Sequence, residues 1–305
     1  MTGSTERVAL ATCRQLPMLS EDDRELIEAF AAMDINAAPA VWDDPSVAWS
    51  DFDLTIVRSC WDYHERRPEF VRWAHGVVAV ANPADIIEWN TDKRHLADLA
   101  ATDVPIVPTA WVTPGDAWQV PWAGTWVAKP SVSLSGLNAG RYNVSDAEQR
   151  SLLAAHVDGL LAAGGTVMIQ PYQSAIDTDG ETALIFIGGR FDHAIRKGAV
   201  LSGPASDADH RFEEDGGMHL APCDATAAQL EIAGHALDRV PGGRQRLLYA
   251  RVDLVPGADG RPLLMELELT EPQLFFKYAP GSADAMAVAA AAQIRGTHQL
   301  GPPQT

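Results

Sequence analysis

The stretch "LLYARVDLVPGADGRPLLMELEL", residues 247–269, has two apolar runs on either side of a turn sequence. With Asp259 and Gly260 as the two residues of a type I′ turn, it predicts a β-hairpin. Because side chains alternate between the faces of a strand, residues two apart share a face. Counting outward from the turn gives two cross-strand pairs on one face: Asp253 with Glu266, and Arg251 with Glu268. Gly257 and Pro262 allow a longer turn, which would shift this register by one residue.

Three carboxylates on one face of a half-buried hairpin repel one another. Two charges 4 Å apart interact by roughly 4 kcal/mol at an effective dielectric constant near 20. One carboxylate must therefore take a proton, or a cation must lie among them. Since the hairpin has no His or Cys, its oxygen ligands favour Mg²⁺, with Mn²⁺ as an alternative. A solvated acidic face neutralised by arginine is the competing interpretation. Glu271 has the opposite strand parity to Glu266 and Glu268 and is not counted as a ligand.

Composition and charge narrow the class of protein. The chain has 305 residues, 47% of them hydrophobic, and a formal net charge of −18. That charge argues against a nucleic-acid partner, which needs a basic surface. The sequence has no apolar run of the roughly 18 residues that cross a membrane and no signal-peptide pattern at its start, so we expect a cytoplasmic protein. The three cysteines are widely spaced, which does not favour disulfide bonds. The sequence has neither CxxC nor HExxH, so it does not favour a zinc site. The sequence is compatible with a homo-oligomer but does not determine the oligomeric state.

The first 88 residues predict an α/β unit. Apolar strands at 7–13 and 53–60 alternate with helices at 20–35 and 65–80, as in a parallel sheet with helical crossovers. Ser20 has the position of a helix N-cap. The sequence has neither GxGxxG nor GxxxxGK[ST], which disfavours a Rossmann cofactor site and a P-loop.

The rest of the chain predicts two α+β subdomains, at 89–170 and 171–295, and a tail at 296–305. In the first we expect a connection at 81–90 leading to a single helix at 91–105 with Thr91 as its N-cap, and later a Ser/Gly loop at 131–142. Strands at 124–131 and 166–172 flank a helix at 146–165. In the second we expect a hairpin at 181–200 turning at Gly188 and Gly189, a helix at 226–240 and the hairpin at 247–269.

The order of lysines and acids along the chain carries a family resemblance. Only four lysines stand against nineteen arginines. The Asp…Glu-x-Glu hairpin is preceded, in chain order, by Lys93, Lys129 in "VAKP", a Ser/Gly loop, the strand "MIQPY" and Lys197 in "HAIRKG". This series, over about residues 1–290, resembles the ATP-grasp ligases of the glutathione synthetase-like and ribosomal-protein-S6-modification-like branch. "ELELTEP" is similar to the Glu-x-Asn-x-Thr-x-Pro signature of that branch, with Glu268 in place of Asn. The loop is richer in serine than the family usually has.

The resemblance implies a fold with ATP between the two α+β subdomains, a carboxylate activated as an acylphosphate, and amide formation. It also assigns roles to residues. The adenine edge would be read by the backbone around Gln170, Pro171 and Tyr172. The phosphates would be bound by Lys93, Lys129 and the loop residues Ser133, Ser135 and Gly136. Two Mg²⁺ ions would be held by Asp253, Glu266 and Glu268. Charge on the transferred phosphoryl group would be stabilised by Lys197, Arg211 and Arg251.

The substrate is expected to be a small amino-acid-like molecule. The pieces "TCRQLP", "VRSCWDYHERRPEF", "EWNTDKRHL" and "PTAWV" resemble a narrower group, the cyclo-ligases that close a ring within O-ureido-D-serine. Arg58 lies at the carboxyl end of a strand, where α/β units bind ligands, and is expected to bind the substrate carboxylate, with Asp62 on its amine. Cys13 and Cys60 are expected to be inert. An intermolecular ligase, a phosphotransferase and a non-catalytic nucleotide-binding relative are the alternatives.

Overall fold

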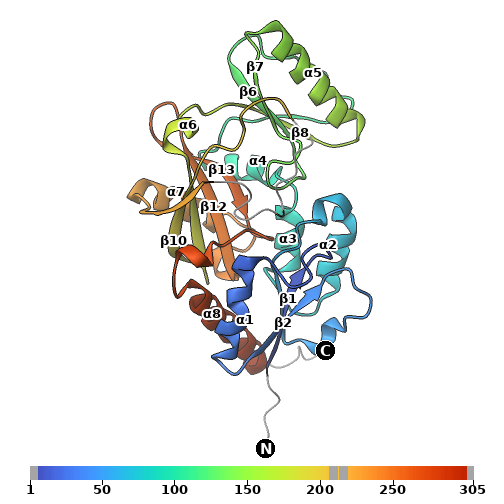
Figure 1. The fold of residues 1–305 in the computed structure, drawn as a ribbon, viewed down its shortest axis with the longest axis vertical. Helices are drawn as coiled ribbons and strands as arrows, with labels where there is room; N and C mark the ends of the chain where they lie inside the picture. The colour runs from blue at the N-terminus through green and yellow to red at the C-terminus, as the bar shows by residue number, and fades with distance from the viewer. Residues whose placement is uncertain (1–5, 206–211, 213–218, 301–305) are drawn as a thin grey trace, which may run out of the picture.

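The computed structural model describes residues 6–205, 212 and 219–300. It arranges them around three sheets, one from the N-terminal part of the chain, one from the middle and one from the C-terminal part (Figure 1). The N-terminal sheet is parallel, and the other two are antiparallel. This confirms an N-terminal α/β unit followed by two α+β parts. Among the described residues, no helix combines the length and the apolar character needed to cross a membrane.

The N-terminal sheet has the strand order β2-β1-β3-β4. Its strands are β1 (Arg7–Thr12), β2 (Asn36–Val41), β3 (Leu54–Val57) and β4 (Val80–Ala81). The sequence did not predict β2, because its Ala- and Pro-containing stretch has low strand propensity. Pro39 is accommodated there because β2 is an edge strand.

Two helices and two single 3₁₀ turns connect these strands. Helix α1 (Glu21–Ala31) begins where predicted, with the Ser20 hydroxyl accepting a hydrogen bond from the N–H of Asp23 at 3.2 Å. Helix α2 (Arg67–Gly76) ends earlier than the predicted residue 80, because Val80 leaves the helix to pair with Thr55 as β4. The 3₁₀ turns are η1 (Trp49–Asp51) and η2 (Tyr63–Arg66).

The single helix predicted at 91–105 is wrong. The chain instead forms α3 (Ala84–Asn90) and α4 (His95–Ala100), and Thr91 is the C-cap of the first rather than the N-cap of the second. The buried Asn90 explains the interruption, since its amide donates to Leu267 O at 2.8 Å and accepts from the N–H of Leu269. The helix break leaves Lys93 between α3 and α4, with its N–H bonded to Ser131 O at 2.9 Å.

The middle sheet has the order β5-β8-β6-β7, and α5 packs against it. The N-cap Asp146 and the glycines after the helix place α5 where the sequence predicts it. The elements of this part are β5 (Ala110–Val112), β6 (Thr125–Pro130), β7 (Gly140–Asn143), α5 (Ala147–Ala162), β8 (Val167–Pro171) and α6 (Ile176–Asp179).

The C-terminal sheet has the order β11-β10-β9-β12-β13. The predicted turn between β9 and β10 is present, and Gly188 and Gly189 both have positive φ, 56° and 74°. The elements of this part are β9 (Glu181–Ile187), β10 (Arg190–Lys197), β11 (Leu220–Cys223), α7 (Ala227–Asp238), η4 (Arg244–Arg246), β12 (Tyr249–Pro256), β13 (Pro262–Glu268), η5 (Phe276–Tyr278) and α8 (Ser282–Leu300).

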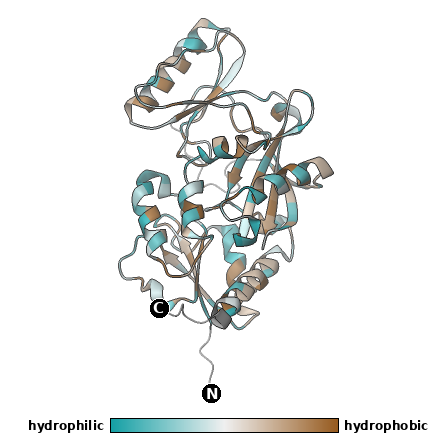
Figure 2. Ribbon diagram, turned by 180° about the vertical axis from the view of Figure 1, so that it is seen from behind, coloured by the Kyte–Doolittle hydropathy of each residue, from teal (hydrophilic) through white to brown (hydrophobic). Residues whose placement is uncertain are grey.

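Helix α8 was not predicted, and it includes residues 296–300 of the expected tail; residues 301–305 lie outside the described part. Its buried Met286 and Ile294 share one core with Leu26 and Phe30 of α1, so the N-terminal unit and the C-terminal sheet are packed together. In Figure 2 the helices around the sheets alternate hydrophilic and hydrophobic residues. This alternation is typical of helices with one face on a core and one in solvent.

Candidate active site

A large cavity lies between the middle sheet and the C-terminal sheet. Its volume is about 1400 Å³ with its open mouth included. Candidates for phosphate, hinge and metal binding line it together: Lys93, Lys129, Ser133, Ser135, Gly136, Gln170, Pro171, Tyr172, Lys197, Arg251, Glu266 and Glu268. The third metal candidate, Asp253, is 1% exposed and is not among the lining residues. The fold therefore brings residues more than 170 positions apart to one cavity.

The β12–β13 hairpin has the predicted pairs but not the predicted turn. Asp253 lies opposite Glu266 and Arg251 opposite Glu268. The turn is longer, with the N–H of Gly257 donating to Arg261 O at 2.8 Å. A β-bulge at Met265 adds the residue that restores the register near the acids. The longer turn shifts the pairing by one residue, and the bulge shifts it back, so the acids keep the predicted cross-strand partners.

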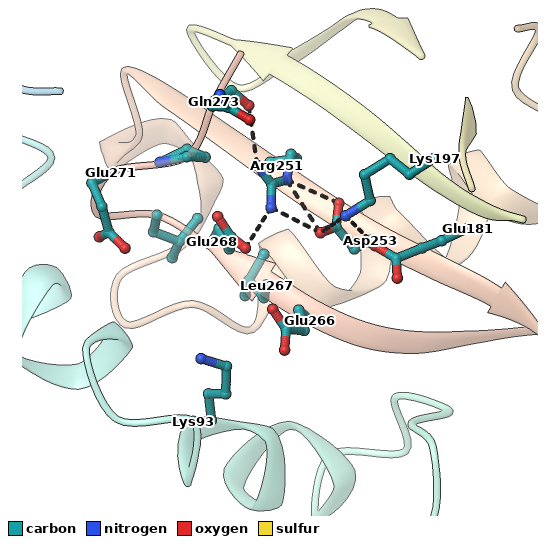
Figure 3. Close-up of polar contacts among 12 residues, drawn as sticks. Lys93, Glu181, Lys197, Arg251, Asp253, Glu266, Leu267, Glu268, Glu271 and Gln273 are labelled. Carbon is teal, nitrogen blue, oxygen red and sulfur yellow. Dashed lines mark hydrogen bonds and ion pairs between the residues drawn. The ribbon is translucent and has the colours of Figure 1, made fainter. Parts of the chain in front are cut away.

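Asp253, Glu266 and Glu268 each present one carboxylate oxygen within 4.8 Å of the other two. Cations compensate this charge (Figure 3). Arg251 binds Asp253 at 3.0 Å and also pairs with Glu268. Lys129 Nζ lies 2.6 Å from Glu266 Oε1. Carboxylate oxygens on a fixed hairpin, close enough to share one ion, fit a hard divalent cation such as Mg²⁺.

Burial and the neighbouring cations Lys129, Lys93, Lys197 and Arg251 together set the ionisation of these acids. Burial acts to raise the pKa of Glu266, but the ammonium groups of Lys129 and Lys93 lower it well below its usual range. Burial likewise opposes ionisation of Asp253, and the charges of Arg251 and Lys197 overcome it and lower its pKa. Burial raises the pKa of Glu268 despite its pairing with Arg251.

Glu181 is a site residue that the sequence analysis missed. It pairs with Lys197, whose Nζ also lies 2.6 Å from Asp253 Oδ2. Burial raises the pKa of Glu181 to about 7, and the charge of Lys197 opposes this rise. Counting from the Gly188–Gly189 turn would pair Glu181 with Arg196, and a bulge between Phe191 and His193 moves the pair to Lys197. The sequence carries no clear signal for that bulge.

The Ser/Gly loop after β6 lies against Lys93, whose Nζ donates a hydrogen bond to Ser133 O. Ser135 and Gly136 have positive φ, 50° and 69°, so the backbone turns sharply at the cavity wall. Such turns let backbone N–H groups converge on an anion. Phosphate binding by this loop stays a prediction.

The hinge residues line the cavity, but their N–H groups are not free for a base. Pro171 has no N–H, and the N–H of Tyr172 donates to Thr125 O at 2.9 Å. The Gln170 side chain donates to Thr109 Oγ1 at 2.9 Å. Adenine therefore cannot be bound by N–H groups at 171 and 172 in this arrangement, and the assignment of the backbone around Gln170, Pro171 and Tyr172 to the adenine edge stays a prediction.

Arg58 and Asp62, the expected substrate contacts, do not line the cavity. Arg58 is 1% exposed and pairs with Asp23 at 2.8 Å. Asp62 is buried and accepts a hydrogen bond from Trp42 Nε1 at 2.8 Å. The structure therefore places neither side chain where a ligand in this cavity could contact it, because position at a strand end does not determine how a side chain turns. Arg211 lies outside the described residues.

The segment after β13 is held at four successive carbonyl groups, a feature that the sequence did not predict. Trp61 Nε1 donates to Glu271 O at 3.1 Å, and Arg58 Nη2 donates to Pro272 O at 2.6 Å. The carbonyls of residues 273 and 274 are contacted by Arg251 at 3.2 Å and His193 at 2.9 Å, respectively. Arg58 thus acts on the site indirectly, by fixing the chain that carries Glu271. Trp61 and Glu271 both line the cavity.

The two predicted inert cysteines are buried away from this cavity. Burial raises the pKa of the Cys13 thiol and raises that of Cys60 more strongly. Neither is among the residues that line the cavity. Nucleophilic catalysis by these thiols is therefore unsupported.

Sequence and fold both match known ligases. Residues 8–84 match the family model of the D-cycloserine synthetase DcsG N-terminal domain. The chain is 36% identical over 304 residues to the cycloserine biosynthesis protein DcsG of Streptomyces lavendulae, covering 94% of this chain and 99% of that protein. It matches the crystal structure of D-cycloserine synthetase DcsG with a TM-score of 0.82 and 33% identity, covering 94% of this chain and 99% of that one.

The fold is shared more widely. The Bacillus anthracis D-alanine–D-alanine ligase in complex with ATP matches with a TM-score of 0.64 over 97% of this chain and 100% of that one, at 13% identity. The protein is an ATP-grasp enzyme, an ATP-dependent carboxylate–amine ligase of a class that uses ATP and Mg²⁺. Within that class, the chain belongs to the DcsG family.

Proposed function

We propose that the enzyme closes a ring within O-ureido-D-serine to form D-cycloserine, with release of ADP and phosphate. The observation that carries the proposal is the three-carboxylate face of the β12–β13 hairpin opposite Lys129 of the middle sheet. The 36% identity to DcsG supports the choice of substrate. The reaction would begin with a substrate carboxylate oxygen attacking the γ-phosphorus of ATP, giving an acylphosphate and ADP. The nitrogen next to oxygen in the ureido group would then attack the acyl carbon, expelling phosphate and closing a ring that still carries the carbamoyl group on that nitrogen. Water would cleave the bond from the nitrogen to the carbamoyl carbon, releasing carbamic acid, which decomposes to carbon dioxide and ammonia, and the ring nitrogen would take a proton to give D-cycloserine.

The three carboxylates suit Mg²⁺, and the enzyme would use two such ions, with Mn²⁺ as an alternative. Asp253, Glu266 and Glu268 would hold them, since their oxygens already lie within 4.8 Å of one another. When bound, the metal neutralises charge on the phosphate oxygens. Lys129, now paired with Glu266, would be released to a phosphate once the carboxylate has a metal partner.

The remaining roles follow from position. Lys93 and the loop carrying Ser133, Ser135 and Gly136 would bind the α- and β-phosphates. Lys197 and Arg251, fixed by Asp253, would stabilise charge on the transferred phosphoryl group; Arg211 stays a sequence-based prediction for the same role. No protein nucleophile takes part. The enzyme works by positioning the reactants and by electrostatic stabilisation.

The test is ADP release with single substrates. The enzyme, ATP and Mg²⁺ should release ADP with O-ureido-D-serine alone and yield D-cycloserine by mass spectrometry. A need for two different amino acids would instead indicate an intermolecular ligase. A phosphorylated product that accumulates without free phosphate would indicate a phosphotransferase. If no substrate is turned over, whether or not nucleotide binds, the protein would be a non-catalytic relative.

A further inference from the structure

A second, smaller cavity adjoins the first. Its volume is about 370 Å³ with its opening included. Tyr63 of the N-terminal unit and His95 of α4 line it opposite Glu271, which follows β13. The two cavities have part of their walls in common: Lys93, Ser133, Leu134, Glu266, Glu268 and Glu271. A substrate whose carboxylate meets the nucleotide in the large cavity can therefore place another group here.

His95 offers this cavity a hydrogen-bond acceptor. Its Nδ1 lies 2.9 Å from Asp92 O, and because a carbonyl only accepts, Nδ1 must carry the proton. Nε2 of the neutral ring is then an acceptor, and in the described part of the chain it has no hydrogen-bond partner. Burial, with a smaller effect of the Lys93 charge, lowers the pKa of His95 to about 4, so the ring stays neutral. At 3% exposure, an unpaired acceptor is costly until a donor arrives.

Glu271 offers the cavity a carboxylate without a cation of its own. Glu266 pairs with Lys129 and Glu268 with Arg251, whereas the Glu271 carboxylate makes no hydrogen bond or ion pair with any described residue (Figure 3). Burial and the charge of Glu268 raise its pKa to about 8. A cationic donor beside it would restore its ionised form.

The cation is not a metal ion bound by the three-carboxylate face. Glu271 does not belong to the set of carboxylates whose oxygens lie within 4.8 Å of one another. A neutral imidazole acceptor and a single carboxylate, both in a confined site, suit an ammonium group, which has three donors and one positive charge. The carbonyls of residues 271 and 272, held by Trp61 and Arg58, keep Glu271 in place before the ligand binds.

We propose that this cavity, between Glu271, His95 and Tyr63, is the subsite for the α-ammonium group of the amino-acid substrate. The inference rests on the proposed function, because it requires a substrate with a free amino group. Glu271 is the charged partner, His95 Nε2 is a neutral acceptor, and Arg58 is a positioning residue for Glu271. The subsite would select amino acids over their des-amino analogues.

The test compares O-ureido-D-serine with 3-(ureidooxy)propanoic acid, in which hydrogen replaces the ammonium group. ADP release and calorimetric binding are measured for the wild type, Glu271→Gln and His95→Phe, with the exposed Glu148→Gln as a matched control. The wild type and the control should prefer the amino acid by about 100-fold in kcat/KM. Glu271→Gln should lose most of that preference, and His95→Phe should reduce it by about 10-fold. Both variants should keep the wild-type Kd for a non-hydrolysable ATP analogue, which would show that they are folded.

Full preference for the amino acid in Glu271→Gln would overturn the inference even if D-cycloserine forms. Turnover of a different amino acid by the wild type would overturn the cyclo-ligase proposal. The ammonium subsite would then be tested by comparing that amino acid with its own des-amino analogue. A wild type that binds no α-amino acid in the presence of nucleotide would overturn both.

Discussion

Lys129 Nζ lies 2.6 Å from Glu266 Oε1, an ion pair that joins β6 of the middle sheet to β13 of the C-terminal sheet across the cavity. Both partners are mostly buried, at 11% and 23% side-chain exposure. In the proposed reaction, two new contacts would take the place of this ion pair: Lys129 with a phosphate of the nucleotide and Glu266 with Mg²⁺.

The first prediction concerns Lys129. Lys129→Met removes the cation that meets phosphate and leaves Glu266 without its partner. We expect kcat/KM for ATP to fall by about 100-fold, and the rise in melting temperature produced by ATP and Mg²⁺ to disappear. Lys277→Met, at an exposed position outside the cavity, is the control and should keep that rise. An undiminished rise in Lys129→Met would contradict the assigned role.

The second prediction concerns the metal. Chelating Mg²⁺ should abolish ADP release, and adding it back should restore activity. Glu266→Gln loses one anionic ligand, so the Mg²⁺ concentration for half-maximal activity should rise by about 10- to 100-fold, whereas the exposed Glu148→Gln should match the wild type. An Mg²⁺ titration of both variants measures this. Coincident curves would remove Glu266 from the metal site.

The third prediction concerns the stability that Arg58 provides. Its pairing with Asp23 is almost fully buried, so Arg58→Met leaves an unpaired buried carboxylate. We expect the free energy of unfolding to fall by about 3 to 5 kcal/mol, measured by urea denaturation. Arg14→Met breaks an ion pair in which the arginine is 57% exposed and should cost less than about 1 kcal/mol. Equal effects of the two substitutions would show that Arg58 does not hold the structure in this way.

The fourth prediction concerns pH. Folded His95 has a pKa of about 4 against an ordinary value of 6.5. Between these values the unfolded chain binds more protons, so stability is lost as pH falls from 6.5 toward 4. The contribution of His95 has an upper limit of about 1.4 kcal/mol per pH unit. His95→Gln should flatten that part of the curve in urea titrations from pH 4 to 7, and the exposed His219→Gln should not. An unchanged slope in His95→Gln would show that this residue does not titrate as inferred.

The sequence predicted the face on which the acids lie, because strand periodicity survives small changes in the turn. Asp253 opposes Glu266 as expected although the turn is longer and Met265 is bulged. Element type was predictable where caps were strong, as at Ser20 and Asp146. Strand and helix periodicity did not predict that the phosphate-binding and metal-binding candidates would line one cavity. That prediction came from the family resemblance.

Tertiary contacts account for what the sequence did not predict. Asn90 breaks the expected helix because its amide bonds to β13 and the residue that follows it, and no local pattern announces a partner 177 residues away. Arg58 was expected at the substrate, yet its guanidinium turns into the core to meet Asp23 and Pro272 O. Glu181 was overlooked because a bulge in β10 shifts its pairing to Lys197.

The acylphosphate is the central claim, and labelled oxygen tests it most directly. O-ureido-D-serine carrying oxygen-18 in both carboxylate oxygens is turned over with ATP and Mg²⁺, and the phosphate is analysed by mass spectrometry or phosphorus NMR. We expect one labelled oxygen in each phosphate released with each D-cycloserine formed. D-cycloserine formed together with unlabelled phosphate would contradict this expectation.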